Sequence, residues 1–315
     1  MPFVRYEEAE VDVGSPTPCR LLAQNVTVGE NLPLQAVRSL GYNGAIAAAA
    51  NGPPDGSWSV TFTMHEADRT SCDEVSATDD KCTPIYCSDD ANFPLKLCYN
   101  GPSVTSFIML LAGDTMFIQG MATSFSVTAE PNSIINATLA GNYYDCGINT
   151  APGQIGVAGG SPRDGTADWA VAHGEATDVS VLQGDIGFSC EPFSCTYEAS
   201  RGLNPIYQLN NLTPSFVMTT DPQQSMTLQG ENLPAATTNQ TFGICDEAPL
   251  CTDMLQLQMD INDFCDGAIC THTVCGVVTS RDIELAVDDV LRGNITITDY
   301  AFPQDLTCDV ICHAI

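Results

Sequence analysis

Three landmarks recur along this chain in the same order, and this repetition constrains the fold more than any other feature. The first landmark is a glycine that follows an alternating run, at Gly29, Gly120 and Gly230, with the pentapeptide GENLP at 29–33 and again at 230–234. The second is a Cys-x4-Cys pair, at Cys82/Cys87, Cys190/Cys195 and Cys265/Cys270. The third is a proline-containing opening segment, at Pro2, Pro94 and Pro205. The repetition predicts three tandem units, at 1–90, 91–200 and 201–315.

The runs around these landmarks alternate apolar and polar residues with the period of two that is typical of β-strands. Clear examples are 58–62, 179–181 and 255–259. We expect the shared glycines to supply a positive φ for the turn that ends each strand. The one helix-like stretch is 45–50, an alanine-rich run that could also be a loop. We therefore predict an all-β fold in which each unit is a sandwich of two sheets.

The third unit resembles a known family. Pro214-Ser215-Phe216, followed by SMTLQGENL at 225–233, is similar to the opening strands of IPT/TIG immunoglobulin-like domains. The resemblance covers roughly 25 residues in this unit and extends in part to the other two. It implies three tandem immunoglobulin-like β-sandwich domains that act as interaction or scaffolding modules in extracellular and surface proteins. The Cys-x4-Cys pairs are a departure, because they are no standard part of that family's pattern.

The charge of the chain excludes several classes of partner. Asp and Glu number 39 against 10 Lys and Arg, which gives a formal net charge of −29. Such a chain repels nucleic-acid phosphates and anionic lipid, so we expect neither as a partner. The longest apolar stretch, 107–118, is interrupted and too short to cross a bilayer, so no membrane span is expected.

Cysteines and glycosylation sequons together favour an oxidising compartment. The chain has 15 cysteines, an odd number, so at least one cannot pair within the chain. Asn-x-Thr sequons, some of which would arise by chance, predict N-linked glycans at Asn25, Asn136, Asn211, Asn239 and Asn294. We expect an extracellular or cell-surface protein. Because the N-terminus carries no signal peptide, we infer that a leader is absent from this numbering.

Disulfide bonds are the favoured role of the clustered cysteines. The candidates are Cys82, Cys87, Cys190, Cys195, Cys265, Cys270, Cys308 and Cys312. Cys265, Cys270, His272 and Cys275 could also bind zinc, but the other two Cys-x4-Cys pairs lack the histidine, which favours disulfides. The spacing between Cys308 and Cys312, which His313 follows, is one residue longer than in the c-type haem attachment motif. A terminal disulfide is therefore favoured there.

The sequence gives little reason to expect an enzyme or a resident cofactor. It contains no nucleophile elbow, no zinc-protease motif and no phosphate-binding glycine loop. Asp260, Asp263 and Asp266 form a weak calcium candidate, although solvated surface charge is the favoured interpretation. Glycans, and possible calcium, are thus the only expected additions to a non-enzymatic protein.

Two functions fit these expectations. The first is a self-assembling subunit of an extracellular filament, coat or matrix, built from head-to-tail contacts between copies of the chain. The strand-like segment 294–298 could donate a strand to a neighbouring subunit, or it could simply complete the third sandwich. The second function is a secreted or surface adhesin or receptor ectodomain that binds a protein or a glycan.

Overall fold

The computed structural model describes residues 9–14, 19–31, 33–41, 43–50, 55–66, 69–71, 74–75, 95, 105–111, 114–144, 170–183, 186–188, 191–209, 214–231, 255–264, 268–284 and 292–299. Within these ranges most residues lie in β-strands, and the only helical turn is a 3₁₀ turn, η2, at Gly174–Ala176. The prediction of an all-β fold is therefore confirmed. Across the same ranges, no helix is long and apolar enough to cross a membrane.

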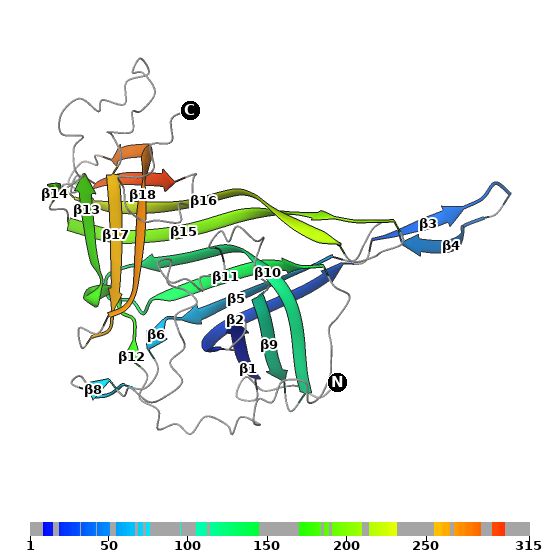
Figure 1. The fold of residues 1–315 in the computed structure, drawn as a ribbon, viewed down its shortest axis with the longest axis horizontal. Helices are drawn as coiled ribbons and strands as arrows, with labels where there is room; N and C mark the ends of the chain where they lie inside the picture. Colours follow the sequence, from blue (N-terminus) through cyan, green and yellow to red (C-terminus); the bar gives the residue numbers. More distant parts are fainter. Residues whose placement is uncertain are drawn as a thin grey trace, which may run out of the picture.

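Nineteen strands are described (Figure 1). Their bounds are β1 Ala9–Gly14, β2 Cys19–Asn31, β3 Leu34–Arg38, β4 Ala45–Ala50, β5 Asp55–Thr63, β6 His65–Glu66, β7 Arg69–Ser71, β8 Glu74–Val75, β9 Thr105–Leu111, β10 Asp114–Ala129, β11 Asn136–Tyr143, β12 Ala170–Val171, β13 Asp178–Gln183, β14 Ile186–Phe188, β15 Glu191–Ile206, β16 Phe216–Glu231, β17 Leu255–Asn262, β18 Ala268–Glu284 and β19 Arg292–Asp299.

Thirteen of these strands form one continuous antiparallel sheet. Their order is β11-β5-β2-β1-β9-β10-β15-β16-β19-β18-β17-β13-β14. The first half of β10 pairs with β9 and its second half pairs with β11, so the strands from β11 to β10 close into a ring. On its other edge, the second half of β10 pairs with β15, which joins this ring to the rest of the sheet.

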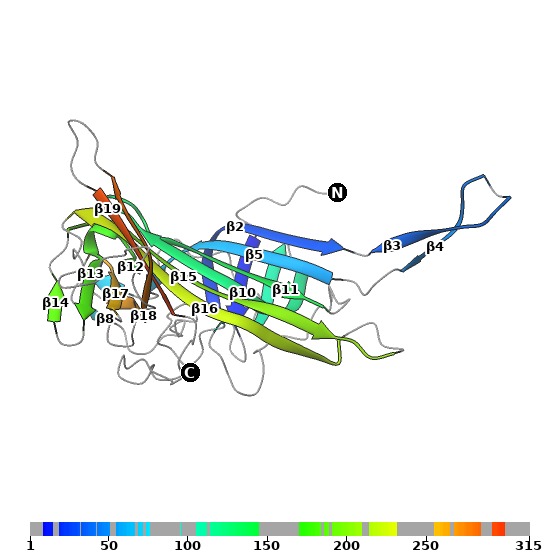
Figure 2. The ribbon, with the colours of Figure 1, turned by 90° about the horizontal axis from the view of Figure 1, so that it is seen from above.

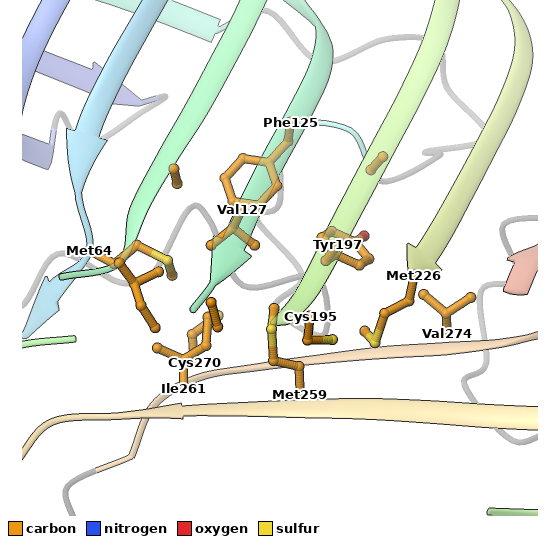
Figure 3. Close-up of a cluster of buried hydrophobic side chains, with 14 of the residues drawn as sticks. Met64, Phe125, Val127, Cys195, Tyr197, Met226, Met259, Ile261, Cys270 and Val274 are labelled. Atoms are coloured by element: carbon orange, nitrogen blue, oxygen red, sulfur yellow. The ribbon is translucent and has the colours of Figure 1, made fainter. Parts of the chain in front are cut away.

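The last strands of the sheet fold back to make a second layer. In Figure 1, β13, β17 and the first half of β18 run across β10, β15 and β16 rather than alongside them. The two layers bury one core between them, and Figure 3 shows Tyr197 and Met226 facing Met259 and Val274 across it. This crossed arrangement is the orthogonal form of sheet packing.

The period of two seen in the sequence explains how these strands bury one face. In β5 and β17 the buried positions alternate with less buried ones, and Val60, Phe62, Leu257 and Met259 lie completely inside the core. The strands predicted at 58–62 and 255–259 are therefore confirmed. Burial of such side chains is the main contribution that stabilises a fold of this kind.

The strand β18 connects the two layers because it bends at its middle. Its first half pairs with β17 and its second half with β19, and the pairing register shifts between Val278 and Ser280. A Cβ at Gly276 would collide with the backbone carbonyl of Thr298, so glycine lets the two strands approach at the bend. A strand that passes from one sheet to the other in this way forms a corner of the sandwich.

The shared glycines do not have the role that the sequence predicts. Gly29 lies in β2 and Gly120 lies in the middle of β10, and neither has a positive φ. At Gly120 the reason for glycine is space, because a Cβ there would collide with the indole of Trp58. In the described residues, the glycines with positive φ are Gly41 and Gly44, in the turn between β3 and β4.

The expected division into three sandwiches, at 1–90, 91–200 and 201–315, differs from the structure. Strands from all three ranges share one sheet: β1 pairs with β9, β5 pairs with β11, and β15 pairs with β16. They also share one core, to which all three ranges contribute buried side chains. The glycine landmarks Gly29, Gly120 and Gly230 therefore lie in β2, β10 and β16, which are strands of one common sheet.

The position of segment 294–298 also differs from the one that the strand-donor hypothesis expects. It lies within β19, which pairs with β16 on one edge and with β18 on the other. Both of its edges are therefore occupied within the same chain, and the segment completes the chain's own sheet. This pairing agrees with the alternative that the segment belongs to the chain's own sheet structure.

The alanine-rich stretch 45–50 is neither a helix nor a loop. It forms β4, which pairs with β3 in a two-stranded hairpin. In Figures 1 and 2 this hairpin projects away from the body of the molecule. We name residues 34–50 the arm.

Candidate functional site

A row of hydroxyl and amide side chains crosses the outer face of the main sheet. Residues directly opposite one another on adjacent strands share a face, and the pairing register places six of them in one row: Thr63, Asn136, Thr128, Thr196, Thr227 and Thr296. The Thr63 hydroxyl donates a hydrogen bond of 2.9 Å to the Asn136 side-chain carbonyl. The hydroxyls of Thr128 and Thr196 lie 3.0 Å apart. Such cross-strand pairs stabilise the sheet.

A second row runs beside the first and has the same character. It contains Asn25, Thr61, Thr138, Ser126, Glu198, Ser225 and Thr298. We name the two rows together the hydroxyl face. Glu198 is its only charged residue, although the chain as a whole carries a net charge of −29. The hydroxyl face is therefore polar and almost uncharged.

Three of the predicted glycosylation sites belong to the hydroxyl face or continue it. Asn25 lies in β2, Asn136 begins β11 and Asn294 lies in β19 next to Thr296. In a strand, residues two apart point to the same face, so a sheet face built from Asn and Thr generates Asn-x-Thr by itself. Glycosylation at these positions stays a prediction, since the sheet gives a second reason for the pattern. The other two sites, Asn211 and Asn239, lie outside the described residues.

Three members of the cysteine and histidine cluster of the third unit, Cys270, His272 and Cys275, lie on the strand β18. Cys270 and His272 are two residues apart on β18 and share its inner face, whereas Cys275 lies on the opposite face. Cys270 and Cys275 are each in a disulfide bond, and five residues of strand keep them too far apart to bond to each other. The strand thus separates the residues that a zinc site would need together.

Most of the other cysteine candidates fall outside the described residues: Cys82, Cys87, Cys190, Cys265, Cys308 and Cys312. Cys195 is described and is buried in the core on β15. In Figure 3 it lies near Met259 and Met226. The proposed pairing within each Cys-x4-Cys therefore stays a prediction.

His272 is a core residue whose environment the sequence did not predict. Its ring stacks on Tyr197, with 4.4 Å between the ring centroids, and lies 5.7 Å from the ring of Phe125. Burial lowers its pKa to about 3, so the imidazole is neutral. Its Nε2 lies 3.5 Å from the sulfur of Cys270, while its Nδ1 has no hydrogen-bond partner. Four histidines in an acidic chain offered no signal that one of them packs as an aromatic ring.

Two of the weak calcium candidates, Asp260 and Asp263, make contacts within the protein. The carboxylate of Asp260 accepts hydrogen bonds from Gln258 Nε2 at 2.8 and 2.9 Å and from the Thr271 hydroxyl at 2.7 Å. Asp263 is buried, and its backbone forms an isolated antiparallel β-bridge with Ala172. Asp266 lies outside the described residues. In the part of the chain that is described, no three His, Cys, Asp or Glu side chains converge as metal ligands would.

The arm exposes apolar side chains on both of its faces. All five residues of β3 are exposed, including Leu34 and Val37, and Leu40 in the turn is fully exposed. The arm carries no acidic residue: the sequence from Asn31 to Pro54 contains one charge, Arg38. A hairpin of this length reaches about 25 Å from its base.

A second acid-free segment lies at the same end of the molecule. Between Glu198 and Asp221 the only charged residue is Arg201. The end of β15, the turn that follows it and the start of β16 expose four large apolar side chains: Ile206, Leu209, Phe216 and Met218. Burial raises the pKa of Tyr207, and Tyr144 and Asp55 raise it further, which places this turn near the base of the arm. We name the arm together with residues 204–209 and 214–218 the apolar end.

Comparison with known proteins gives no relative from which a function could be transferred: no family model matches the chain, and no characterised protein matches it significantly. The similarity to IPT/TIG domains therefore stays an interpretation of a short segment. Of the residues that carry it, Phe216 and 225–231 lie in the single long strand β16, Pro214 and Ser215 lie just before it, and 232–233 lie outside the described residues.

Proposed function

We propose that this protein is a non-enzymatic structural subunit that assembles with copies of itself into an extracellular filament, coat or matrix. The observation that carries the proposal is the apolar end. An isolated hairpin has no core of its own, so exposed apolar side chains on both its faces are costly unless another surface covers them.

The charge distribution supports self-assembly in particular. Two copies with a net charge of −29 repel each other, and an acid-free end is the surface on which this repulsion is weakest. About 20–30 residues form one side of a standard protein interface, and the apolar end supplies a set of this size. Added salt should strengthen assembly, because it screens the repulsion between the acidic bodies.

An extracellular location is part of the same proposal. It is supported by the cysteine content and by the disulfide bonds of Cys270 and Cys275, which persist in oxidising compartments. Disulfide bonds, together with N-linked glycans, would suit a protein that works outside the cell.

The test compares assembly of the full chain with that of variants of the apolar end. Leu40→Ser together with Leu209→Ser should abolish long polymers in electron microscopy and reduce the scattering mass to that of a monomer. Gln223→Ser changes an exposed residue of the main sheet and serves as the control that should still assemble. A wild-type protein that remains monomeric at high salt and high concentration would rule out this function.

The hydroxyl face favours a second candidate function, an adhesin or receptor ectodomain. Uncharged hydroxyl and amide groups in regular rows can exchange hydrogen bonds with a glycan or with a polar protein surface. Glycan-array binding by a monomeric protein, lost on replacing Thr128 and Thr196 by valine, would favour this function over self-assembly.

A further inference from the structure

A second exposed apolar patch lies at the opposite end of the molecule from the arm. It is built from the β10–β11 turn at 130–134, the η2 segment at 172–178 and the β17–β18 turn at 262–264, and we name it the turn cluster. In Figures 1 and 2, the strands that lead into it, β12 and β17, lie at one end of the long axis and the arm lies at the other.

The turn cluster is held together by short backbone contacts. The amide of Gly174 donates a 2.9 Å hydrogen bond to the carbonyl of Ser133, and the amide of His173 donates one of 3.2 Å to Asn262. A Cβ at Gly174 would collide with the carbonyl of Glu130, so glycine allows the first two segments to touch. The ring of His173 lies 4.1 Å from that of Phe264, measured between centroids. This end therefore has a defined shape.

The turn cluster resembles the apolar end in exposing apolar side chains, and it is opposite to the apolar end in charge. Two large apolar side chains stand out from it, Ile134 with 55% and Phe264 with 65% of its surface exposed. Glu130 and Glu175 are exposed beside them, and the segments that form the cluster contain no Lys or Arg. The apolar end has charge of the opposite sign, because its arm carries Arg38 and no acidic residue.

We propose that the apolar end of one copy docks on the turn cluster of a second copy, with Arg38 of the arm facing Glu130 and Glu175. This inference rests on the proposed self-assembly and specifies its geometry. The two surfaces are different and lie at opposite ends, so the contact is head to tail and leaves a free surface at each end of every pair. Such a contact propagates into a filament or closes only as a ring.

A charge-swap experiment tests this pairing. Arg38→Glu places a negative arm against the acidic cluster, and Glu130→Arg with Glu175→Arg places Arg38 against positive charge. Each variant alone should lose at least about tenfold in association constant, measured by light scattering and sedimentation. Mixed in equal amounts, the two variants should assemble again, because both kinds of contact in the mixture then join opposite charges.

The mixture also shows that each variant is folded, since an unfolded partner could not restore assembly. The matched control is Glu198→Arg with Asp282→Arg, which makes the same change in net charge at exposed acids that belong neither to the turn cluster nor to the apolar end, and it should not reduce assembly.

Three outcomes would overturn the inference. Wild-type filaments with no loss in either variant would place the contact elsewhere while leaving self-assembly intact. Loss in both variants without recovery on mixing would exclude the Arg38–glutamate pairing. A variant Arg38→Glu that binds wild type more tightly, with no effect of the Glu130 and Glu175 changes, would indicate that two apolar ends dock on each other. A wild-type chain that does not assemble at all would instead refute the underlying function.

Discussion

The imidazole of His272 lies nearly parallel to the phenol ring of Tyr197, with 4.4 Å between the centroids and 16° between the planes. The two residues come from different layers of the sandwich, so their contact crosses the core. The Tyr197 hydroxyl in turn donates a 3.2 Å hydrogen bond to the side chain of Gln224, whose amide donates one of 3.1 Å to Asp299. Hydrogen bonds thus connect Tyr197 through Gln224 to Asp299, beside a histidine that stays neutral.

The first prediction concerns pH. The folded pKa of His272, about 3, lies below the ordinary value of 6.5, so between these two values the unfolded state binds a proton that the folded state does not. The stability from this group is complete above pH 6.5 and decreases as the pH falls toward 3. At pH 5 the free energy of unfolding should be about 2 kcal/mol lower than at pH 7.5 on this account.

The measurement is denaturant unfolding of wild type and His272→Leu at both pH values. The variant should lose this part of the pH dependence, while Met259→Leu, a core change without a titrating group, should keep it. An equal slope in wild type and His272→Leu would contradict a buried neutral imidazole.

The second prediction concerns the packing of Trp58. This buried indole lies against Gly141, and a Cβ at that position would collide with the ring and with the carbonyl of Met121. Gly141→Ala should therefore lower the free energy of unfolding by about 1–3 kcal/mol through overpacking. Ala140→Ser, one residue away on the outer face, should change it far less. Thermal unfolding followed by tryptophan fluorescence measures both.

The third prediction concerns the threonine rows. Thr128→Val or Thr196→Val alone leaves one hydroxyl without its partner and should cost about 0.5–1.5 kcal/mol. The double variant should cost less than the sum of the two, because both polar groups are then replaced together. A double-mutant cycle measures this coupling, and strictly additive effects would show that the hydroxyls do not interact in solution.

The fourth prediction concerns the disulfides of β18. Peptide mapping without reduction should link Cys270 and Cys275 to two different cysteines elsewhere in the chain. Removing a native disulfide from a small secreted domain typically costs about 2–5 kcal/mol, so reduction should lower the melting temperature. A peptide that joins Cys270 directly to Cys275 would be incompatible with an extended β18.

The sequence predicted strands better than it predicted their partners. The alternation at 58–62, 179–181 and 255–259 located parts of β5, β13 and β17, because burial of one face leaves a period of two in the residues themselves. The pairing of β1 with β9, almost a hundred residues apart, leaves no such local trace. Recurrent strand motifs alone therefore cannot distinguish separate domains from strands of one sheet.

The arm shows how tertiary context outweighs local preference. Alanine favours helix, yet 45–50 forms β4 because Gly41 and Gly44 adopt the positive φ of a hairpin turn and bring the stretch back along β3. The features that define the apolar end were visible in the sequence as two long gaps between acidic residues. Their location at one end required the fold.

The direction of the long strands has a mechanical consequence. In Figure 1, β5, β10, β11, β15 and β16 run broadly along the long axis of the molecule, from the end near the turn cluster toward the arm. A pulling force applied between these two ends would load neighbouring strands in shear, so many backbone hydrogen bonds would have to break together instead of one after another. A subunit with this geometry would be suited to carry tension.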